Sequence, residues 1–204
     1  MCASSSSNSL TLTVLMPAYN EARGLAVSVE ALLAALDRQG ITYEVLIADD
    51  ASTDATGSVA DGLAAIHEQV RVIHHAVNEG IGGGFISGVA AARGEWFILI
   101  PADLAMDLAE LQRYFAAAET ADVLVGIRSD RSDYSGWRRI VSFVNIGLIQ
   151  FLFGMRERQF NYITMYRLVV LRAMTVEYWR SAFFHAETII KAKALGYRIA
   201  EVEV

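Results

Sequence analysis

The chain has 204 residues, which is the size of one domain with a large core. Its net charge of −6 does not favour nonspecific binding to nucleic acid, and its single cysteine, Cys2, excludes an internal disulfide. No apolar run reaches the ~18–20 residues that a membrane-spanning helix needs. Residues 1–9 lack the basic and apolar regions of a signal peptide, and we expect them to form a disordered leader.

The remainder, residues 10–204, reads as one domain in which strands and helices alternate. Hydrophobic runs predict strands at 10–16, 43–48, 70–74, 96–100, 123–127, 160–167 and 197–204. Helical periodicity predicts helices at 25–36, 55–66, 85–92, 108–118, 137–155 and 186–195, with a flexible glycine-rich turn at 78–84. This order is typical of a three-layer α/β fold with a mostly parallel central sheet. Because the chain ends within a predicted strand, we expect it to be part of a longer protein.

The stretch 96–107 organises this pattern. A continuous apolar run, typical of a strand buried on both faces, stops at Pro101, and Asp103 follows at once. Ligands of open α/β sheets bind beyond the carboxyl ends of the strands, so Asp103 is a candidate ligand for a metal-bound anionic substrate. A second interpretation stays open, in which Asp103 and Asp107 only start the next helix.

Other polar residues follow other predicted strands. Tyr19 and Glu21, and then Asp49 and Asp50, each come directly after one. Because parallel strands end at one edge of the sheet, these side chains and Asp103 can line one crevice. Carboxylates there can accept hydrogen bonds from a nucleobase or ribose, and one can hold a divalent ion.

The segment after residue 127 has a different character. The predicted helix 137–155 is apolar on most faces, but Arg138, Ser142 and Asn145 share one face. Arg128 with Arg138 or Arg139 could hold a second phosphate, because guanidinium groups match phosphate geometry. The apolar faces are either buried in the core or lie in a membrane interface.

Several common sites are not supported. Residues 80–88 fit neither a dinucleotide-binding fingerprint nor a P-loop, and no serine lies in a nucleophile elbow. His74 and His75 have no accompanying cysteine or histidine cluster, so we interpret them as structural rather than as metal ligands.

Taken together, the motifs resemble family 2 glycosyltransferases with the GT-A fold, in the subgroup similar to dolichol-phosphate mannosyltransferases. The resemblance rests on the blocks at residues 13–21, 49–54, 78–80 and 94–104, and it covers the chain from about residue 10 to its end. It implies transfer of a sugar, with inversion, from a UDP- or GDP-linked donor to a polyprenyl phosphate, with Mg²⁺ or Mn²⁺ as cofactor. It also implies a location at the cytoplasmic face of a membrane, peripheral or anchored by segments outside this chain, with the 137–155 helix as the contact.

The resemblance assigns roles to matching residues. The nucleotide-sugar pocket would be formed by Pro17, Ala18, Tyr19, Glu21, Asp49, Asp50, Ala102 and Asp103. Asp49 would line it, Asp50 would support its wall, and Asp103 would be the metal ligand. The acceptor phosphate would be held by Arg128, Arg138, Arg139 and Ser142. Asp103, Arg128 and Arg138 would be the catalytic residues. Glu187 matches an acidic position under the acceptor site, although an acid in a first helical turn explains it equally well.

Three departures from the family pattern affect this assignment. Pro101 stands where the family usually has the first metal-binding aspartate, and proline cannot bind a metal. Gln159 stands where many relatives carry an acid, and the chain ends before the basic loop that often follows the last strand. Two alternatives therefore stay open: a transferase that acts on a non-lipid glycan, and a non-catalytic protein that binds nucleotide sugars.

Overall fold

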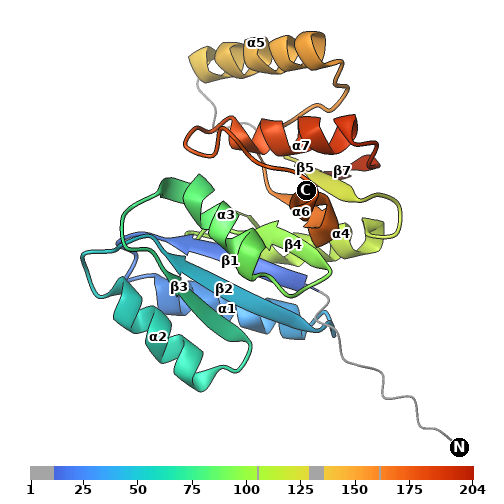
Figure 1. Ribbon diagram of the computed structural model, residues 1–204. Coiled ribbons are helices and arrows are strands. Elements are labelled where there is room, and N and C mark those ends of the chain that lie inside the picture. Colours follow the sequence, from blue (N-terminus) through green and yellow to red (C-terminus); the bar gives the residue numbers. More distant parts are fainter. Residues whose placement is uncertain (1–11, 105, 129–135, 161) are drawn as a thin grey trace, which may run out of the picture.

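The computed structural model describes residues 12–104, 106–128, 136–160 and 162–204, without the side chains of 136–143 and 145 (Figure 1). The predicted leader at residues 1–9 lies outside this part of the chain.

A seven-stranded sheet has the order β3-β2-β1-β4-β6-β5-β7. All neighbouring strands are parallel except β6, which runs antiparallel to both β4 and β5. The strands are β1 (Leu12–Ala18), β2 (Tyr43–Asp49), β3 (Val70–His74), β4 (Trp96–Leu99), β5 (Val123–Ile127), β6 (Thr164–Arg167) and β7 (Ile199–Glu203). The expected mostly parallel sheet is confirmed.

Helices cover both faces of this sheet (Figure 1). They are α1 (Leu25–Asp37), α2 (Thr56–Ile66), α3 (Gly80–Ala91), the 3₁₀ helix η1 (Leu108–Glu110), α4 (Leu111–Ala117), α5 (Gly136–Phe153), α6 (Leu168–Arg172) and α7 (Phe184–Ala194). Side chains of α1, α2 and α4 share one apolar core with the sheet, and those of α3, α6 and α7 share a second core on the other face. The α5 helix lies beyond α7, on the side away from the sheet (Figure 1).

Alternation along the strands produces the two cores. In β1, Leu12, Val14 and Met16 face the first core and Leu15 faces the second, as expected when successive side chains point to opposite faces. All four residues of β4 are buried, which confirms that the apolar run before Pro101 is a strand enclosed on both sides. Among the described residues, no helix is long and apolar enough to cross a membrane.

The glycine-rich segment differs from its prediction as a flexible turn. Helix α3 begins at Gly80, so the following glycines are helical and most of them are buried. A Cβ atom on Gly82 would lie 1.7 Å from the backbone oxygen of Trp179. The absence of a side chain therefore lets the segment before α7 pack directly on α3.

This contact predicts opposite effects for two glycine-to-alanine changes. Gly82→Ala should lower the free energy of unfolding by about 1–3 kcal/mol, because the new methyl group collides with backbone. Gly62→Ala in α2, where nothing lies within 4 Å of the added atom, should raise it by about 0.5–1 kcal/mol. Urea unfolding of both variants measures the difference, and equal effects would contradict the proposed contact.

Candidate active site

A cavity opens where β1 and β4 separate. Their pairing ends at Leu15 and Leu99, with a last hydrogen bond from the Ile100 N–H to the Leu15 carbonyl at 2.9 Å. Beyond this point each of the two segments contains a proline, Pro17 in the β1 segment and Pro101 in the β4 segment, and proline has no N–H to donate. The strand order reverses direction between β1 and β4, and open α/β sheets bind ligands at such a point.

The cavity has a volume of about 480 Å³ and is built from loops that follow β1, β2, β3 and β4. Its lining residues are Pro17, Ala18, Tyr19, Glu21, Ala48, Asp50, Asn78, Gly80, Ile81, Gly84, Pro101, Ala102 and Asp103. Most residues that the sequence assigns to the nucleotide-sugar pocket thus lie around one cavity. The roles expected for the two acids after β2 are reversed, because Asp50 lines the cavity and Asp49 does not.

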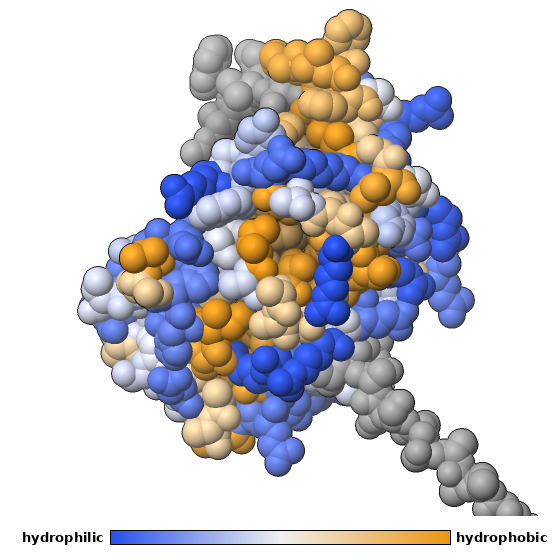
Figure 2. All heavy atoms as spheres, in the orientation of Figure 1, coloured by the Kyte–Doolittle hydropathy of each residue, from blue (hydrophilic) through white to orange (hydrophobic). Residues whose placement is uncertain are grey.

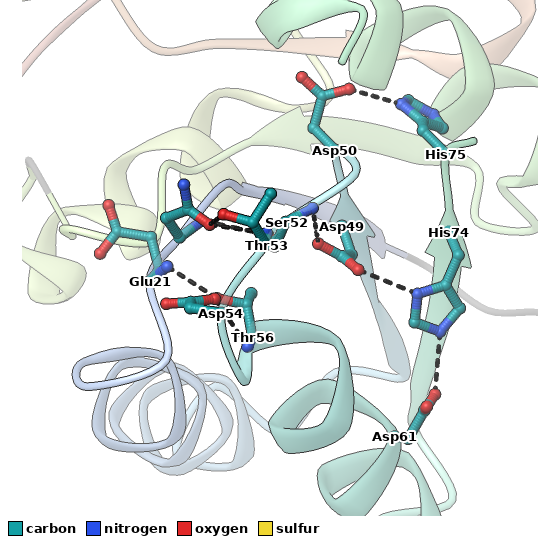
Figure 3. Close-up of polar contacts among 11 residues, drawn as sticks. Glu21, Asp49, Asp50, Ser52, Thr53, Asp54, Thr56, Asp61, His74 and His75 are labelled. Carbon is teal, nitrogen blue, oxygen red and sulfur yellow. Dashed lines mark hydrogen bonds and ion pairs between the residues drawn. The ribbon is translucent and has the colours of Figure 1, made fainter. Parts of the chain in front are cut away.

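Asp50 is held in the cavity wall by three donors, of which Figure 3 shows His75. Its Oδ1 accepts from the Glu79 N–H and from His75 Nδ1, both at 2.8 Å. Its Oδ2 accepts from the Gly80 N–H at 2.7 Å. The carboxylate therefore ties the end of β2 to the start of α3 and has one orientation.

Asp49 faces a different set of groups (Figure 3). It accepts from the Ser52 N–H at 3.2 Å and contacts His74 Nδ1 at 3.1 Å, and the other nitrogen of His74 contacts Asp61 at 3.0 Å. Burial raises the pKa of Asp49, but the hydrogen bonds from Ser52 and His74 outweigh it and hold the pKa below its ordinary value. The pKa of His74 is raised by Asp61 and by Asp49. Asp49 therefore supports the β2–β3 side of the site from outside the cavity.

The two histidines match the two aspartates through strand register. Asp49 is opposite His74 in the parallel pairing of β2 with β3, so Asp50 and His75 also meet. The interpretation of both histidines as structural overlooked the contact of His75 with a residue that lines the cavity. Two acids and two histidines at the ends of adjacent predicted strands were the signal that could have revealed this contact.

Hydrogen bonds also join the loops after β1 and β2. The Glu21 N–H donates to Thr56 Oγ1 at 2.8 Å, and the Asn20 N–H donates to Ser52 Oγ at 3.0 Å. In return, the Thr53 N–H donates to the Asn20 side chain at 2.9 Å. These bonds fix the backbone that carries Tyr19 and Glu21 (Figure 3).

Within the described part of the chain, three residues other than glycine have positive φ, and each is next in sequence to a residue that lines the cavity. They are Asn20 (φ 56°), Ala51 (φ 59°) and Leu104 (φ 50°), which follow β1, β2 and β4. Asparagine tolerates the left-handed region, whereas alanine and leucine are strained there. Such strain is concentrated at functional sites in proteins.

Asp103 and Asp107 have separate places after β4. Asp103 is exposed and lines the cavity, whereas the Asp107 side chain accepts from the Ala109 N–H and begins η1. Helix initiation thus accounts for Asp107 alone. Within the described part of the chain, no group of three or more His, Cys, Asp or Glu side chains could hold a metal ion.

A smaller cavity of about 160 Å³ adjoins the first and shares Ile81 and Pro101 with it. Tyr162 and His185 also line it, and burial lowers the pKa of His185 to about 4, so this imidazole is neutral at pH 7. Arg128 lies near Tyr162, where its charge opposes the rise in the tyrosine pKa that burial causes. The Arg128 carbonyl accepts from the Gln159 amide at 3.1 Å, a bond that an acid at this position could not donate.

Glu187 is buried and has a structural set of partners. Its carboxylate accepts from the N–H groups of Glu177 and Tyr178, at 2.8 and 2.9 Å, and pairs with Lys191 at 2.8 Å. It thereby fixes the segment before α7. The side chains of Arg138, Arg139 and Ser142, predicted to hold the acceptor phosphate, lie outside the described residues, and their backbone belongs to α5.

Residues 13–182 match the family described as Glycosyl transferase family 2. The chain belongs to this family. It is 28% identical over 99% of its length to Glycosyltransferase AglD of Haloferax volcanii, of which it covers 34%. It is 27% identical over 96% of its length to the Undecaprenyl-phosphate mannosyltransferase of Micrococcus luteus, of which it covers 83%. It is 40% identical over 48% of its length to the Dolichyl-phosphate beta-glucosyltransferase of Drosophila melanogaster, of which it covers 32%. The chain thus spans about a third of the first and third of these relatives.

Solved structures have the same fold. Glucosyl-3-phosphoglycerate synthase from Mycobacterium tuberculosis, in complex with Mn²⁺, UDP and phosphoglyceric acid, matches with a TM-score of 0.72 at 18% identity over 95% of this chain and 68% of that one. Mannosyltransferase PcManGT from Pyrobaculum calidifontis, in complex with GDP-Man and Mn²⁺, matches with a TM-score of 0.62 at 19% identity over 95% of this chain and 56% of that one. The expected GT-A fold and family are confirmed.

The strained loops predict a stabilising substitution. Ala51→Gly should raise the free energy of unfolding by about 1 kcal/mol, because glycine adopts positive φ without steric cost. Ala34→Gly is the matched control at an exposed position inside α1, where the same change should cost about 1 kcal/mol. Thermal unfolding of both variants measures the signs, and a loss of stability in Ala51→Gly would contradict the strain.

Proposed function

We propose that this family 2 glycosyltransferase transfers a sugar from a nucleotide-diphosphate donor to a polyprenyl phosphate. The observation that carries the proposal is the cavity between β1 and β4, with Asp50 on one flank and Asp103 on the other. The names of the relatives, an undecaprenyl-phosphate and a dolichyl-phosphate glycosyltransferase, support a polyprenyl-phosphate acceptor.

In the proposed reaction, an oxygen of the acceptor phosphate attacks the anomeric carbon of the donor sugar. The bond from this carbon to the nucleoside diphosphate breaks on the opposite side, so the configuration is inverted. A phosphate is already anionic near neutral pH and needs no strong general base. The protein therefore acts by positioning the two substrates and by stabilising charge on the leaving group.

The residues present fit a divalent ion that is shared with the donor. Asp103 would supply a carboxylate, and Pro101 supplies none. Mg²⁺ is commonly held by one or two carboxylates together with substrate phosphates and water, so one acid suffices. When bound, the ion would neutralise the charge of the diphosphate. Two structural neighbours that contain Mn²⁺ with UDP or GDP-Man support this use of a cation within the fold.

The acceptor would approach from the side of the smaller cavity. Arg128 lies near Tyr162 there, and its cationic guanidinium suits a phosphate. Arg138, Arg139 and Ser142 would complete this site from the start of α5, together with the catalytic role assigned to Arg138.

The end of α5 supports a contact with the membrane that contains the acceptor. Val144, Leu148, Phe151 and Leu152 are exposed and have the spacing of one helical face. Figure 2 shows apolar side chains gathered on α5 at the top of the molecule. The contact would be peripheral, through the apolar face of a helix lying in the interface, and we propose that it forms at the cytoplasmic face.

Substitution of Asp103 tests the donor site. Asp103→Asn should weaken Mg²⁺- or Mn²⁺-dependent binding of a nucleotide sugar at least tenfold, because the carboxylate that would hold the ion is lost. The fold should stay intact, because Asp103 is exposed. Calorimetry with and without metal measures this, and transfer of radiolabelled sugar to polyprenyl phosphate measures the activity. Unchanged binding and turnover would remove Asp103 from the site, and binding by the wild type without turnover on any acceptor would favour a non-catalytic protein.

Substitution on α5 tests the membrane contact. Phe151→Glu should lower, several-fold, the fraction of protein that co-sediments with vesicles of phosphatidylcholine and one-third phosphatidylglycerol. The reason is that the Phe151 ring is 86% exposed and a charge there would oppose its insertion. Val27→Glu is the control, since Val27 is also exposed but lies on α1, and α1 covers the opposite face of the sheet. Equal loss in both variants would contradict the contact, and transfer to a soluble glycan instead of polyprenyl phosphate would identify the other acceptor class.

A further inference from the structure

The hydrogen-bond capacity of Asp50 is almost used up within the protein. An ionised aspartate has two oxygens with about four lone-pair positions in total. His75 and Glu79 occupy both positions on Oδ1, and Gly80 occupies one on Oδ2. Among the described residues no other donor contacts Asp50, so one position on Oδ2 is left for a ligand.

We propose that the cavity selects a nucleobase with one hydrogen-bond donor on its recognition edge, so that the donor substrate is linked to UDP rather than GDP. This inference rests on the proposed donor site and concerns its choice of nucleotide. Uracil offers a single N3–H between two carbonyl groups, which matches the one free position of Asp50.

The base belongs at the Asp50 side of the cavity for electrostatic reasons. Two flanks are available: Asp103, after β4, and Asp50, after β2. The diphosphate needs a metal or cation beside it, and Asp103 can share such an ion. The buried Asp50 would repel phosphate oxygens but accepts N–H groups, and the half-exposed ring of Tyr19, which lines the same cavity, offers a face for stacking.

Guanine does not match this arrangement. Its N1–H and exocyclic amino group are adjacent donors that pair with both oxygens of a carboxylate. Oδ1 is saturated, so the exocyclic amino group would find no acceptor on Asp50. A ligand that buries a polar group without a hydrogen-bond partner binds more weakly, so such a site discriminates strongly against that ligand.

Two other residues that line the cavity are consistent with uracil. Asn78 also lines the cavity, and its amide can donate to a carbonyl group next to the N3–H. Glu21 has a carboxylate that could serve guanine, but Figure 3 shows it projecting from the loop after β1, apart from the Asp50 carboxylate.

His75 is therefore a specificity-determining residue that acts through Asp50. Its Nδ1 must carry a proton to bond the carboxylate, because a carboxylate only accepts. Its Nε2 contacts Ser87 Oγ at 2.8 Å, which fixes the ring in place. Loss of His75 would free the second position on Oδ1 and create the paired acceptors that guanine needs.

Calorimetric titration of the wild-type chain with UDP, GDP and IDP, each with Mg²⁺, tests the inference. IDP carries hypoxanthine, which is guanine without the exocyclic amino group. UDP should bind at least tenfold more tightly than GDP, and IDP should recover much of that loss. N3-methyl-UDP, which has no N3–H, should bind at least tenfold more weakly than UDP.

Three variants separate selection from folding. His75→Ala should reduce the UDP-to-GDP preference several-fold, and His75→Asn, whose amide can still donate to Oδ1, should preserve it. His74→Ala is the matched control because His74 pairs with Asp49 outside the cavity, and it should leave the preference unchanged.

The outcomes are distinguishable. Equal binding of UDP and GDP, or equal binding of GDP and IDP, would overturn the inference while leaving the donor site in place. Unchanged binding of N3-methyl-UDP would place Asp50 away from the base and would also overturn it. Failure of all these nucleotides to bind would overturn the proposed donor site itself.

Discussion

The site depends on one constraint, the end of pairing between β1 and β4. Two central strands that continued side by side would leave no room for a ligand. Here the ladder stops at Leu15 and Leu99, and Pro17 and Pro101 cannot extend it with N–H groups. The separated chain ends then form the floor of a cavity whose walls come from the neighbouring loops. Pro101 stands where the family resemblance leads one to expect a metal-binding acid, and because it has no N–H to pair it suits the opening of the sheet.

Polar contacts then convert this opening into a defined shape. The register of β2 with β3 aligns two acids with two histidines, so that one acid supports the wall while the other lies in it. Side chains of the loop after β2 hold the backbone after β1, and backbone N–H groups at the start of α3 hold Asp50. No single loop could fix these positions alone. The cavity is therefore a property of four parallel strand ends acting together.

The sequence predicted the elements and the sheet edge well, because both follow from hydrophobic periodicity and from the common direction of parallel strands. It did not predict that the glycines after Gly80 are helical, since the packing of the Trp179 backbone that requires a glycine at position 82 is visible only in the tertiary structure. It expected Asp49 to line the pocket and Asp50 to support its wall, whereas the direction of each side chain depends on partners in β3 and α3 and reverses these roles. Antiparallel β6 also required tertiary information, because a short strand carries no sign of its direction.

The antiparallel pairing of β6 has a further consequence. The Gly126 N–H donates to the Ile163 carbonyl at 3.0 Å, so the segment between β5 and β6, which includes α5, leaves and re-enters the sheet at almost the same point. The entropy cost of closing such a loop rises only slowly with its length. Evolution can therefore lengthen, shorten or replace this excursion without altering strand order or the cavity between β1 and β4. A fold built in this way can exchange the part that we propose meets the acceptor while it keeps the part that we propose binds the donor.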